Sequence, residues 1–221
     1  MTKVVCISDL QNLCNEIKSE MLPDGDLLLV AGDLGGWGTK EELVGINNWF
    51  GKISHKYKKI ICIAGNHDEC LMELDGHKIL TNCTYLQDEL IEVEGLRIYG
   101  TPASEMNELR QYGRFIAFCD PAYLEKVAND IPPDLDILLA HGPCYGILDK
   151  LVDGRSVGNK YMRQAVLLKK PKYFVCGHIH ESHGQEEVFG TTFINAALCS
   201  EVNQMLLSNG DLYFQPIVIE L

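Results

Sequence analysis

Five short runs of apolar residues recur along the chain, and within each run the apolar positions follow one another without polar interruption. A strand with one face in water alternates apolar and polar residues, whereas a strand covered on both faces does not. The runs therefore predict five central β-strands that are buried on both faces. They are residues 3–8, 27–31, 59–63, 137–140 and 173–176.

Several stretches between these runs have helical character. Pro121 follows Asp120, a pair that is typical of a first helical turn preceded by an N-cap residue. The alternation of strands and helices along the chain predicts an α/β sandwich. The helices are expected at residues 12–20, 40–51, 121–129 and 160–169.

Two further segments predict β-hairpins. The first joins residues 90–93 to residues 96–99 through a Glu-Gly turn. The second joins residues 202–207 to residues 212–219, and an Asn-Gly pair between apolar strands is a strong hairpin signal. No internal repeat or low-complexity linker divides the sequence, so residues 1–221 are expected to form one domain.

Composition narrows the classes of function. The chain has 221 residues, of which 46% are hydrophobic, and this is enough for one good core. Its formal net charge of -12 argues against a general nucleic-acid binder, which needs clusters of Lys and Arg. The charge does not exclude phosphate substrates, because bound cations would reverse the local field.

Nine cysteines raise the question of disulfides. The number is odd, the spacing is scattered, and Cys6, Cys62 and Cys176 lie within apolar runs. Reduced thiols are therefore expected. No signal peptide precedes the first run and no apolar run is long enough to span a membrane, so the protein is expected to be soluble and cytoplasmic.

Five small polar clusters lie where apolar runs give way to loops. In α/β sheets, ligands gather beyond the carboxyl ends of the strands, so clusters that are distant in sequence can converge there. Oxygen ligands mixed with imidazoles suit divalent ions such as Mn, Fe and Zn, and five clusters supply enough ligands for two ions. The clusters contain Asp9, Asp33, Asn66 with His67, His141, and His178 with His180.

None of the clusters is decisive alone. A Gly-Asp pair such as that at Asp33 is usually a turn, and an Asn-His pair after Gly is often a loop with an Asx turn. His141 before Gly-Pro would also fit a strand-end histidine bound to backbone. The order and placement of all five clusters together favour a two-metal hydrolase.

The order Asp, Gly-Asp, Gly-Asn-His-Asp, His-Gly and Gly-His-x-His resembles the calcineurin-like metallophosphoesterase superfamily. The likeness is closest to its metallophosphoesterase-domain (MPPED) branch of class III phosphodiesterases, and it extends over a domain of residues 1–221. The resemblance implies an α/β fold: a single-domain four-layer α/β/β/α sandwich with two mixed sheets and a dimetal site at the carboxyl ends of the strands. The supporting segments are residues 65–68, 97–102, 136–143, 146–149, 176–181 and 191–196.

The same resemblance implies two divalent metal ions, Mn²⁺ first, with Fe or Zn as alternatives. The ions would polarise the phosphoryl oxygens and share a hydroxide that attacks phosphorus in line. The implied ligands are Asp9 and His180 with Gln11 beside them for the first ion, Asn66, His141 and His178 for the second, and Asp33 bridging both.

His67 and Asp68 are the implied catalytic residues. His67 would stabilise the developing charge or protonate the leaving oxygen. Asp68 would orient the His67 ring, although an acidic residue at this position also fits a helix N-terminal charge.

Gln11 departs from the superfamily pattern, which has a histidine at this position. An amide carbonyl can bind a metal, but it is a weaker donor than imidazole. Alternatively, Gln11 would only hydrogen-bond a metal-bound water. Both alternatives predict a looser first metal site.

A basic and aromatic segment, residues 110–118, is the candidate substrate cap, with Arg114, Phe115 and Phe118 as candidate contacts. Alternatively, the two phenylalanines would pack on the core as one helix face, and Arg114 would be a solvated surface residue. Trp37 lies in a glycine-rich loop just after Asp33, where it would either stack on substrate or cover the core.

The expected function is phosphodiester hydrolysis on small nucleotide diesters such as cyclic mononucleotides, to which the resembled branch is linked. A phosphomonoesterase or nucleotide pyrophosphatase of the same fold is the first alternative. A scaffold with a weakened metal site is the second, and Gln11 is the feature that favours it. The expected partner is a small phosphoester or nucleotide rather than nucleic acid or membrane, and a homodimer is left open.

Overall fold

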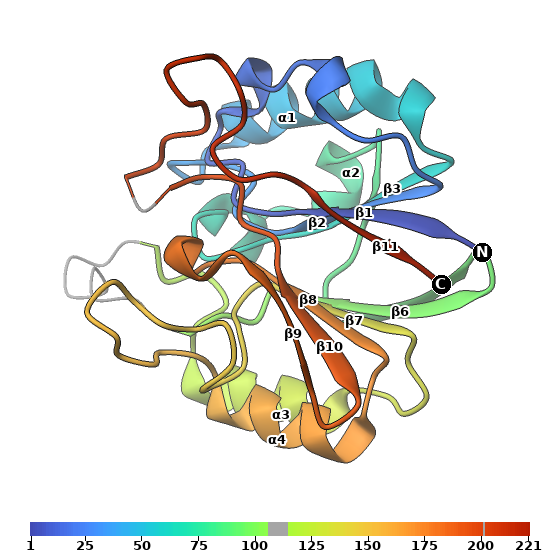
Figure 1. The fold of residues 1–221 in the computed structure, drawn as a ribbon, viewed down its shortest axis with the longest axis vertical. Coiled ribbons are helices and arrows are strands. Elements are labelled where there is room, and N and C mark those ends of the chain that lie inside the picture. Colours follow the sequence, from blue (N-terminus) through green and yellow to red (C-terminus); the bar gives the residue numbers. More distant parts are fainter. Residues whose placement is uncertain (106–114, 201) are drawn as a thin grey trace.

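The computed structural model describes residues 1–105, 115–200 and 202–221. Two β-sheets pack face to face, and helices cover the outer face of each sheet (Figure 1). The expected four-layer α/β/β/α sandwich with two mixed sheets is therefore confirmed.

The first sheet has five strands in the order β11-β1-β2-β3-β4. Neighbours from β1 to β4 run parallel, and β11 pairs with β1 antiparallel. The strands are β1 (Lys3–Ile7), β2 (Leu27–Ala31), β3 (Lys59–Ile63), β4 (Thr84–Tyr85) and β11 (Ile217–Glu220).

The second sheet has six strands in the order β5-β6-β7-β8-β10-β9. Its centre is parallel, and antiparallel pairs close both edges. The strands are β5 (Glu89–Val93), β6 (Leu96–Thr101), β7 (Ile137–Ala140), β8 (Tyr173–Cys176), β9 (Gly184–Val188) and β10 (Thr191–Asn195).

The unbroken apolar runs are explained by burial on both faces of each central strand. In β1, Val5 and Ile7 face the core beneath the helices, whereas Val4 and Cys6 face the core between the two sheets. Because successive side chains point to opposite faces, both sets must be apolar.

Three of the four predicted helices form, each with the N-terminal cap that its sequence offers. Thr39 and Glu42 make a capping box at the start of α1 (Lys40–Ile53), and Asp120 and Asn159 cap α3 (Pro121–Asp130) and α4 (Lys160–Lys169). None of the helices in the described parts of the chain is long and apolar enough to cross a membrane. The shorter helical segments are α2 (Gly76–Ile79) and the 3₁₀ turns η1 (Cys14–Glu16), η2 (Ser19–Met21), η3 (Ser54–Lys56), η4 (Glu69–Met72) and η6 (His180–Ser182).

The helix expected at residues 12–20 is wrong, because only the turns η1 and η2 form there. Gln11 and Asn12 have positive φ angles of 48° and 61°, which an α-helix cannot include. Their backbone N–H groups donate to the carbonyls of Asp33 and Leu34 instead. A tertiary contact between two loops therefore prevents the helix from starting.

The hairpin expected at the C-terminal end forms at its turn but not along the predicted strands. Its two predicted strands meet only next to the Asn-Gly turn, through an isolated bridge between Leu206 and Leu212 and the hydrogen bond from Tyr213 N–H to the Met205 carbonyl. The rest of the return strand is β11, which pairs with β1 at the edge of the first sheet. The sequence analysis missed a different hairpin, β9 with β10. Its outer strand carries Gln185, Glu186 and Glu187 and lacks an apolar run, as an edge strand in water allows. The predicted hairpin of β5 and β6 is confirmed.

Candidate metal centre

The candidate site lies where the loops that leave both sheets come together. Asp9, Asp33 and Asn66 follow β1, β2 and β3, while His141 and His178 follow β7 and β8 of the opposite sheet. The backbone N–H of His178 donates to the Asp9 carboxylate at 3.0 Å, so a contact between the two sheets is built into the site. Ligands from both sheets therefore meet at one edge of the sandwich, as the sequence predicts.

Strained backbone positions these side chains. Asp9, Asp33 and His178 have φ angles of 57°, 49° and 69°, in the left-handed region that non-glycine residues avoid. The Asp9 N–H donates to the carbonyl of Gly32 at 3.0 Å. Gly177 is required here because a Cβ atom on it would lie 2.1 Å from Asp9 Oδ2. The surrounding structure thus fixes the loops in conformations that present carboxylates and imidazoles to one another.

Asp33 is at the centre of this arrangement and is almost fully buried. Its Oδ1 atom lies 3.2 Å from His141 Nε2 and accepts from the backbone N–H of His67 at 2.9 Å, and its Oδ2 atom accepts from Gln11 Nε2 at 3.0 Å. Burial alone would raise the pKa of Asp33, but the neighbouring imidazoles, His141 first, hold it well below the ordinary value. Asp33 is therefore a carboxylate with both oxygens directed into the site.

Three of the predicted ligands of the second ion lie around Asp33. The ligand atoms of Asp33, His141 and His178 all lie within 4.8 Å of one another. Asn66 Oδ1 lies 3.1 Å from His141 Nε2. The structure thus brings together every residue that the sequence analysis assigned to the second ion.

The first predicted group is also assembled. His180 Nε2 lies 3.2 Å from Asp9 Oδ1, and both side chains are buried. Gln11 reaches the same region, but its amide nitrogen is directed at Asp33. The structure therefore favours a hydrogen-bonding role for Gln11 in this arrangement, and its role as a ligand stays a prediction.

Backbone carbonyls fix the tautomers of two of the histidines. His141 Nδ1 lies 2.7 Å from the carbonyl of Ala31, and His180 Nδ1 lies 2.8 Å from the carbonyl of Ser200. A carbonyl can only accept, so each Nδ1 carries a proton and donates it, and each Nε2 faces the carboxylates. This orientation of imidazole by an outer partner is the usual arrangement of histidine ligands in metal sites.

The charges of the histidines follow from the same contacts. Burial alone would lower the pKa of His141 and of His180, but the neighbouring carboxylates of Asp33 and Asp9 raise each pKa to about 9. For His178, burial and the charge of His141 lower the pKa to about 3. Buried protons at Nε2 of His141 and His180 thus sit where a cation would bind, and metal binding would release them.

These observations fit divalent metal ions. The donors are carboxylate oxygens, an amide oxygen and imidazole nitrogens, the set that Mn, Fe and Zn accept. Asp9 lies against His180, and Asp33 lies with His141 and His178, at a buried loop junction where unpaired charges would be costly.

His67 lies beside the ligand cluster. Its Nδ1 lies 2.9 Å from the carbonyl of Gly36 and therefore donates to it. The ring stacks on Phe115 with centroids 3.9 Å apart, and its Nε2 lies 3.8 Å from Asp33 Oδ2. The stacking and the hydrogen bond fix the ring with Nε2 toward the carboxylate.

Asp68 does not orient the His67 ring, which corrects that expectation. Its carboxylate accepts from the backbone N–H groups of Leu34, Gly35 and Gly65. Burial and the charge of Asp33 raise the pKa of Asp68 to about 7. Asp68 therefore ties the loop after β2 to the loop after β3, and Gly36 and Phe115 hold the ring.

The predicted substrate contacts divide into three groups. Phe115 lies against His67, and Trp37, which is 62% exposed, has its ring centroid 6.3 Å from that of Phe115. Phe118 is buried in the core against Tyr123, so the structure corrects its assignment as a substrate contact and supports core packing. Arg114 lies outside the described residues.

The described residues also form a cavity of about 250 Å³ over the candidate ligands. Leu151, Glu181 and Asn203 also line it. Glu181 ends the motif that contains His178 and His180 but was given no role, and Leu151 and Asn203 lie in no motif, because loops that are distant in sequence supply them. Asn195 was missed as well. Its amide donates to the carbonyls of Gly177 and Ile179 and so holds the loop of His178 and His180.

Comparisons with known proteins agree with this geometry. Residues 3–182 match the family model of the calcineurin-like phosphoesterases. UPF0046 protein K07C11.7 of Caenorhabditis elegans is 35% identical over 92% of this chain and 72% of its own length. Metallophosphoesterase domain-containing protein 1 of Homo sapiens is 34% identical over 100% of this chain and 71% of its own length.

A solved structure gives the same result for the fold. The crystal structure of phosphopantetheinyl hydrolase from Mycobacterium tuberculosis matches with a TM-score of 0.56 and 18% identity over 88% of each chain. At this identity the likeness concerns the fold alone.

Substitution of Gln11 by histidine tests the first metal group. An imidazole at this position adds a nitrogen donor beside Asp9 and His180, so we expect Gln11→His to bind its first Mn²⁺ roughly tenfold more tightly or better, measured by isothermal titration calorimetry. The matched control is Asn12→His, which adds the same ring at the exposed neighbouring position and should leave affinity unchanged. A Gln11→His isotherm identical to that of the wild type would show that position 11 does not contribute a ligand.

Proposed function

Because the chain belongs to the calcineurin-like phosphoesterase family, and is thus a metal-dependent phosphoesterase, we propose that it is a phosphodiesterase acting on small nucleotide diesters, cyclic mononucleotides above all. The observation that carries this proposal is the placement of His67. Its ring is fixed by Gly36 and Phe115 beside the buried Asp33 carboxylate, where a proton donor for a leaving oxygen is needed.

The chain's own residues would hold two divalent ions, Mn²⁺ in our proposal. Bound there, the ions would neutralise charge on the phosphoryl oxygens and supply a nucleophile at neutral pH. The proposed holders are Asp9 and His180 for the first ion, Asn66, His141 and His178 for the second, and Asp33 for both.

His67 would act as the general acid. Because Nδ1 already donates to the carbonyl of Gly36, the nitrogen that can give a proton to substrate is Nε2. The leaving oxygen of a nucleotide diester is a ribose alkoxide, which leaves poorly without a proton. A positioned acid therefore contributes more to this reaction than to the departure of an acidic phenol.

Phe115 and Trp37 would form an aromatic wall for the base. Phe115 covers one face of the His67 ring, and the indole of Trp37 is exposed beside it. Ligand pockets commonly combine such apolar walls with a few polar groups. The cavity of about 250 Å³ is small for a ligand site, which supports a mononucleotide-sized substrate.

The net charge of -12 supports the same choice of substrate size. A polyanion would have to approach against this charge, and long-range repulsion slows such association. A small diester needs to meet only the local field of the bound cations.

A panel of esters tests the substrate class. With added Mn²⁺ we expect turnover of bis-p-nitrophenyl phosphate and of 2′,3′-cyclic AMP, and slower turnover of p-nitrophenyl phosphate. Asp33→Asn removes the charge at the centre of the site and should abolish Mn²⁺-dependent activity on all three esters. Faster turnover of the monoester would contradict the diesterase proposal. A folded wild type no more active than Asp33→Asn would contradict catalysis itself and favour a scaffold with a weakened first metal group.

The role of His67 can be tested by comparing two substrates whose leaving groups differ in their need for a proton. We expect His67→Ala to retain Mn²⁺ binding and to lose about 10²–10⁴-fold in kcat on 2′,3′-cyclic AMP, with a much smaller loss on bis-p-nitrophenyl phosphate, whose phenolate leaves without a proton. His55→Ala, at an exposed histidine, is the matched control and should match the wild type. Equal losses on both substrates would remove His67 from the proton-donating role.

A further inference from the structure

We propose that Cys62 and Cys83 form a redox-active dithiol, which a hydroperoxide converts to a disulfide. Cys62 lies in β3. Cys83 directly precedes β4, which is the strand next to β3 in the first sheet. Their Sγ atoms are 3.2 Å apart. This modification site is separate from the catalytic proposal and does not depend on it.

The sheet register explains the contact between the sulfur atoms. β3 and β4 run parallel, with Ile61 opposite Thr84 and Cys62 opposite Tyr85. Cys83 precedes Thr84 and therefore lies opposite Ile60, diagonal to Cys62, and the side chains of both cysteines contribute to the core beneath the helices. A disulfide needs its sulfur atoms at about 2.05 Å, so the two sulfur atoms would have to approach by roughly 1 Å, through side-chain rotation with a small shift of the short strand β4.

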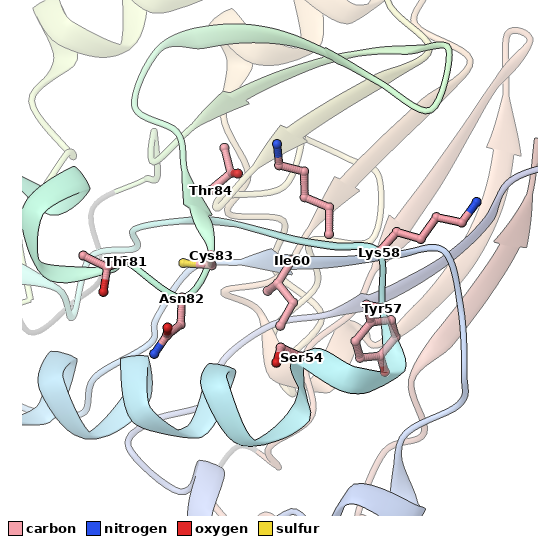
Figure 2. A pocket seen from close by; sticks show the side chains of 9 residues that line it. Ser54, Tyr57, Lys58, Ile60, Thr81, Asn82, Cys83 and Thr84 are labelled. Atoms are coloured by element: carbon pink, nitrogen blue, oxygen red, sulfur yellow. The ribbon is translucent and has the colours of Figure 1, made fainter.

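A surface cavity lies beside one of the two cysteines. The cavity has a volume of about 260 Å³, and Cys83 lines it together with Ser54, Tyr57, Asn82 and Thr84 (Figure 2). Cys83 is only partly buried, whereas Cys62 is buried. A small polar oxidant would therefore reach Cys83 first.

The chemistry that follows is balanced. The Cys83 thiolate attacks one oxygen of hydrogen peroxide, the O–O bond breaks, and the products are the sulfenic acid of Cys83 and hydroxide, which takes up the thiol proton to become water. The Cys62 sulfur then attacks the Cys83 sulfur, the S–O bond breaks, and the departing hydroxide takes the Cys62 proton to form a second water. Two thiols lose two electrons, and one peroxide gains them.

The order of the two steps agrees with the surroundings of Cys62. Burial, with a contribution from Cys83, raises the pKa of Cys62 well above its ordinary value, so its sulfur stays protonated until the sulfenic acid forms beside it. Cys62 would thus act as the resolving cysteine and Cys83 as the cysteine that meets the oxidant.

The cross-link would close a segment that matters for the candidate metal centre. Residues 63–82 lie between the two cysteines, and they include Asn66, His67 and Asp68. Closing a loop of roughly 20 residues restricts the unfolded chain and stabilises the folded one. Oxidation would therefore stabilise the part of the chain that carries the proposed general acid.

The test uses the full chain loaded with Mn²⁺ and treated with one molar equivalent of hydrogen peroxide. We expect free thiols to fall by two per chain, a non-reduced peptide map to show Cys62 joined to Cys83, and dithiothreitol to reverse both changes. Oxidation should also raise the thermal midpoint by roughly 5–10 °C.

Two variants complete the design. On oxidation, Cys83→Ser should lose no pair of free thiols, and its thermal midpoint should not rise. Cys70→Ser, at another partly buried cysteine, should respond as the wild type does. If a variant does not fold, the peptide map of the oxidised wild type is sufficient to test the proposal. Unchanged thiols, a disulfide between other cysteines, or Cys83 oxidised to sulfinic acid with Cys62 still free would each overturn the proposal.

Discussion

The Asp33 carboxylate lies between loops from both sheets, and it is the contact on which the candidate site depends. One oxygen meets His141 from the second sheet, and the other meets Gln11 from the first. A carboxylate buried without such partners would cost several kcal/mol, so the partners must stay in place when the protein folds. The same pairing puts a proton on His141 that a metal ion would replace, which links the stability of the junction to its chemistry.

The loop junction around Asp33 requires strained backbone conformations in the residues that form it. Asp9, Gln11, Asp33 and His178 adopt left-handed conformations, each of which costs of order 1–3 kcal/mol for a residue with a side chain. Hydrogen bonds between the loops hold these conformations, as when Asp9 and Gln11 donate to carbonyls of the loop after β2. Strain of this kind is common where a site must present several polar groups at fixed positions.

Much of the fold and of the candidate site could be predicted from the sequence, because local residue patterns determine the strands, the helix starts and the polar clusters. Uninterrupted apolar runs gave the central strands, and cap residues such as Asp120 marked the helix that follows. The candidate ligands were noticed because each polar cluster lies within a few residues of a strand end, and the resemblance to the calcineurin-like superfamily assigned them to two ions. The helix at residues 12–20 failed because Gln11 and Asn12 bind a loop that is distant in sequence, and the role of Asp68 failed because its partners are backbone N–H groups of two other loops. The orientation of Gln11 toward Asp33 likewise depends on tertiary contacts that one sequence does not display.

The central claim is that Asp33 holds two divalent ions between the two groups of ligands. The most direct measurement is a crystal structure of the Mn²⁺-loaded protein with anomalous diffraction from manganese. We predict two anomalous peaks, one on each side of the Asp33 carboxylate, the first beside Asp9 and His180 and the second beside His141 and His178. A single peak, or peaks that the Asp33 carboxylate does not touch, would contradict the claim.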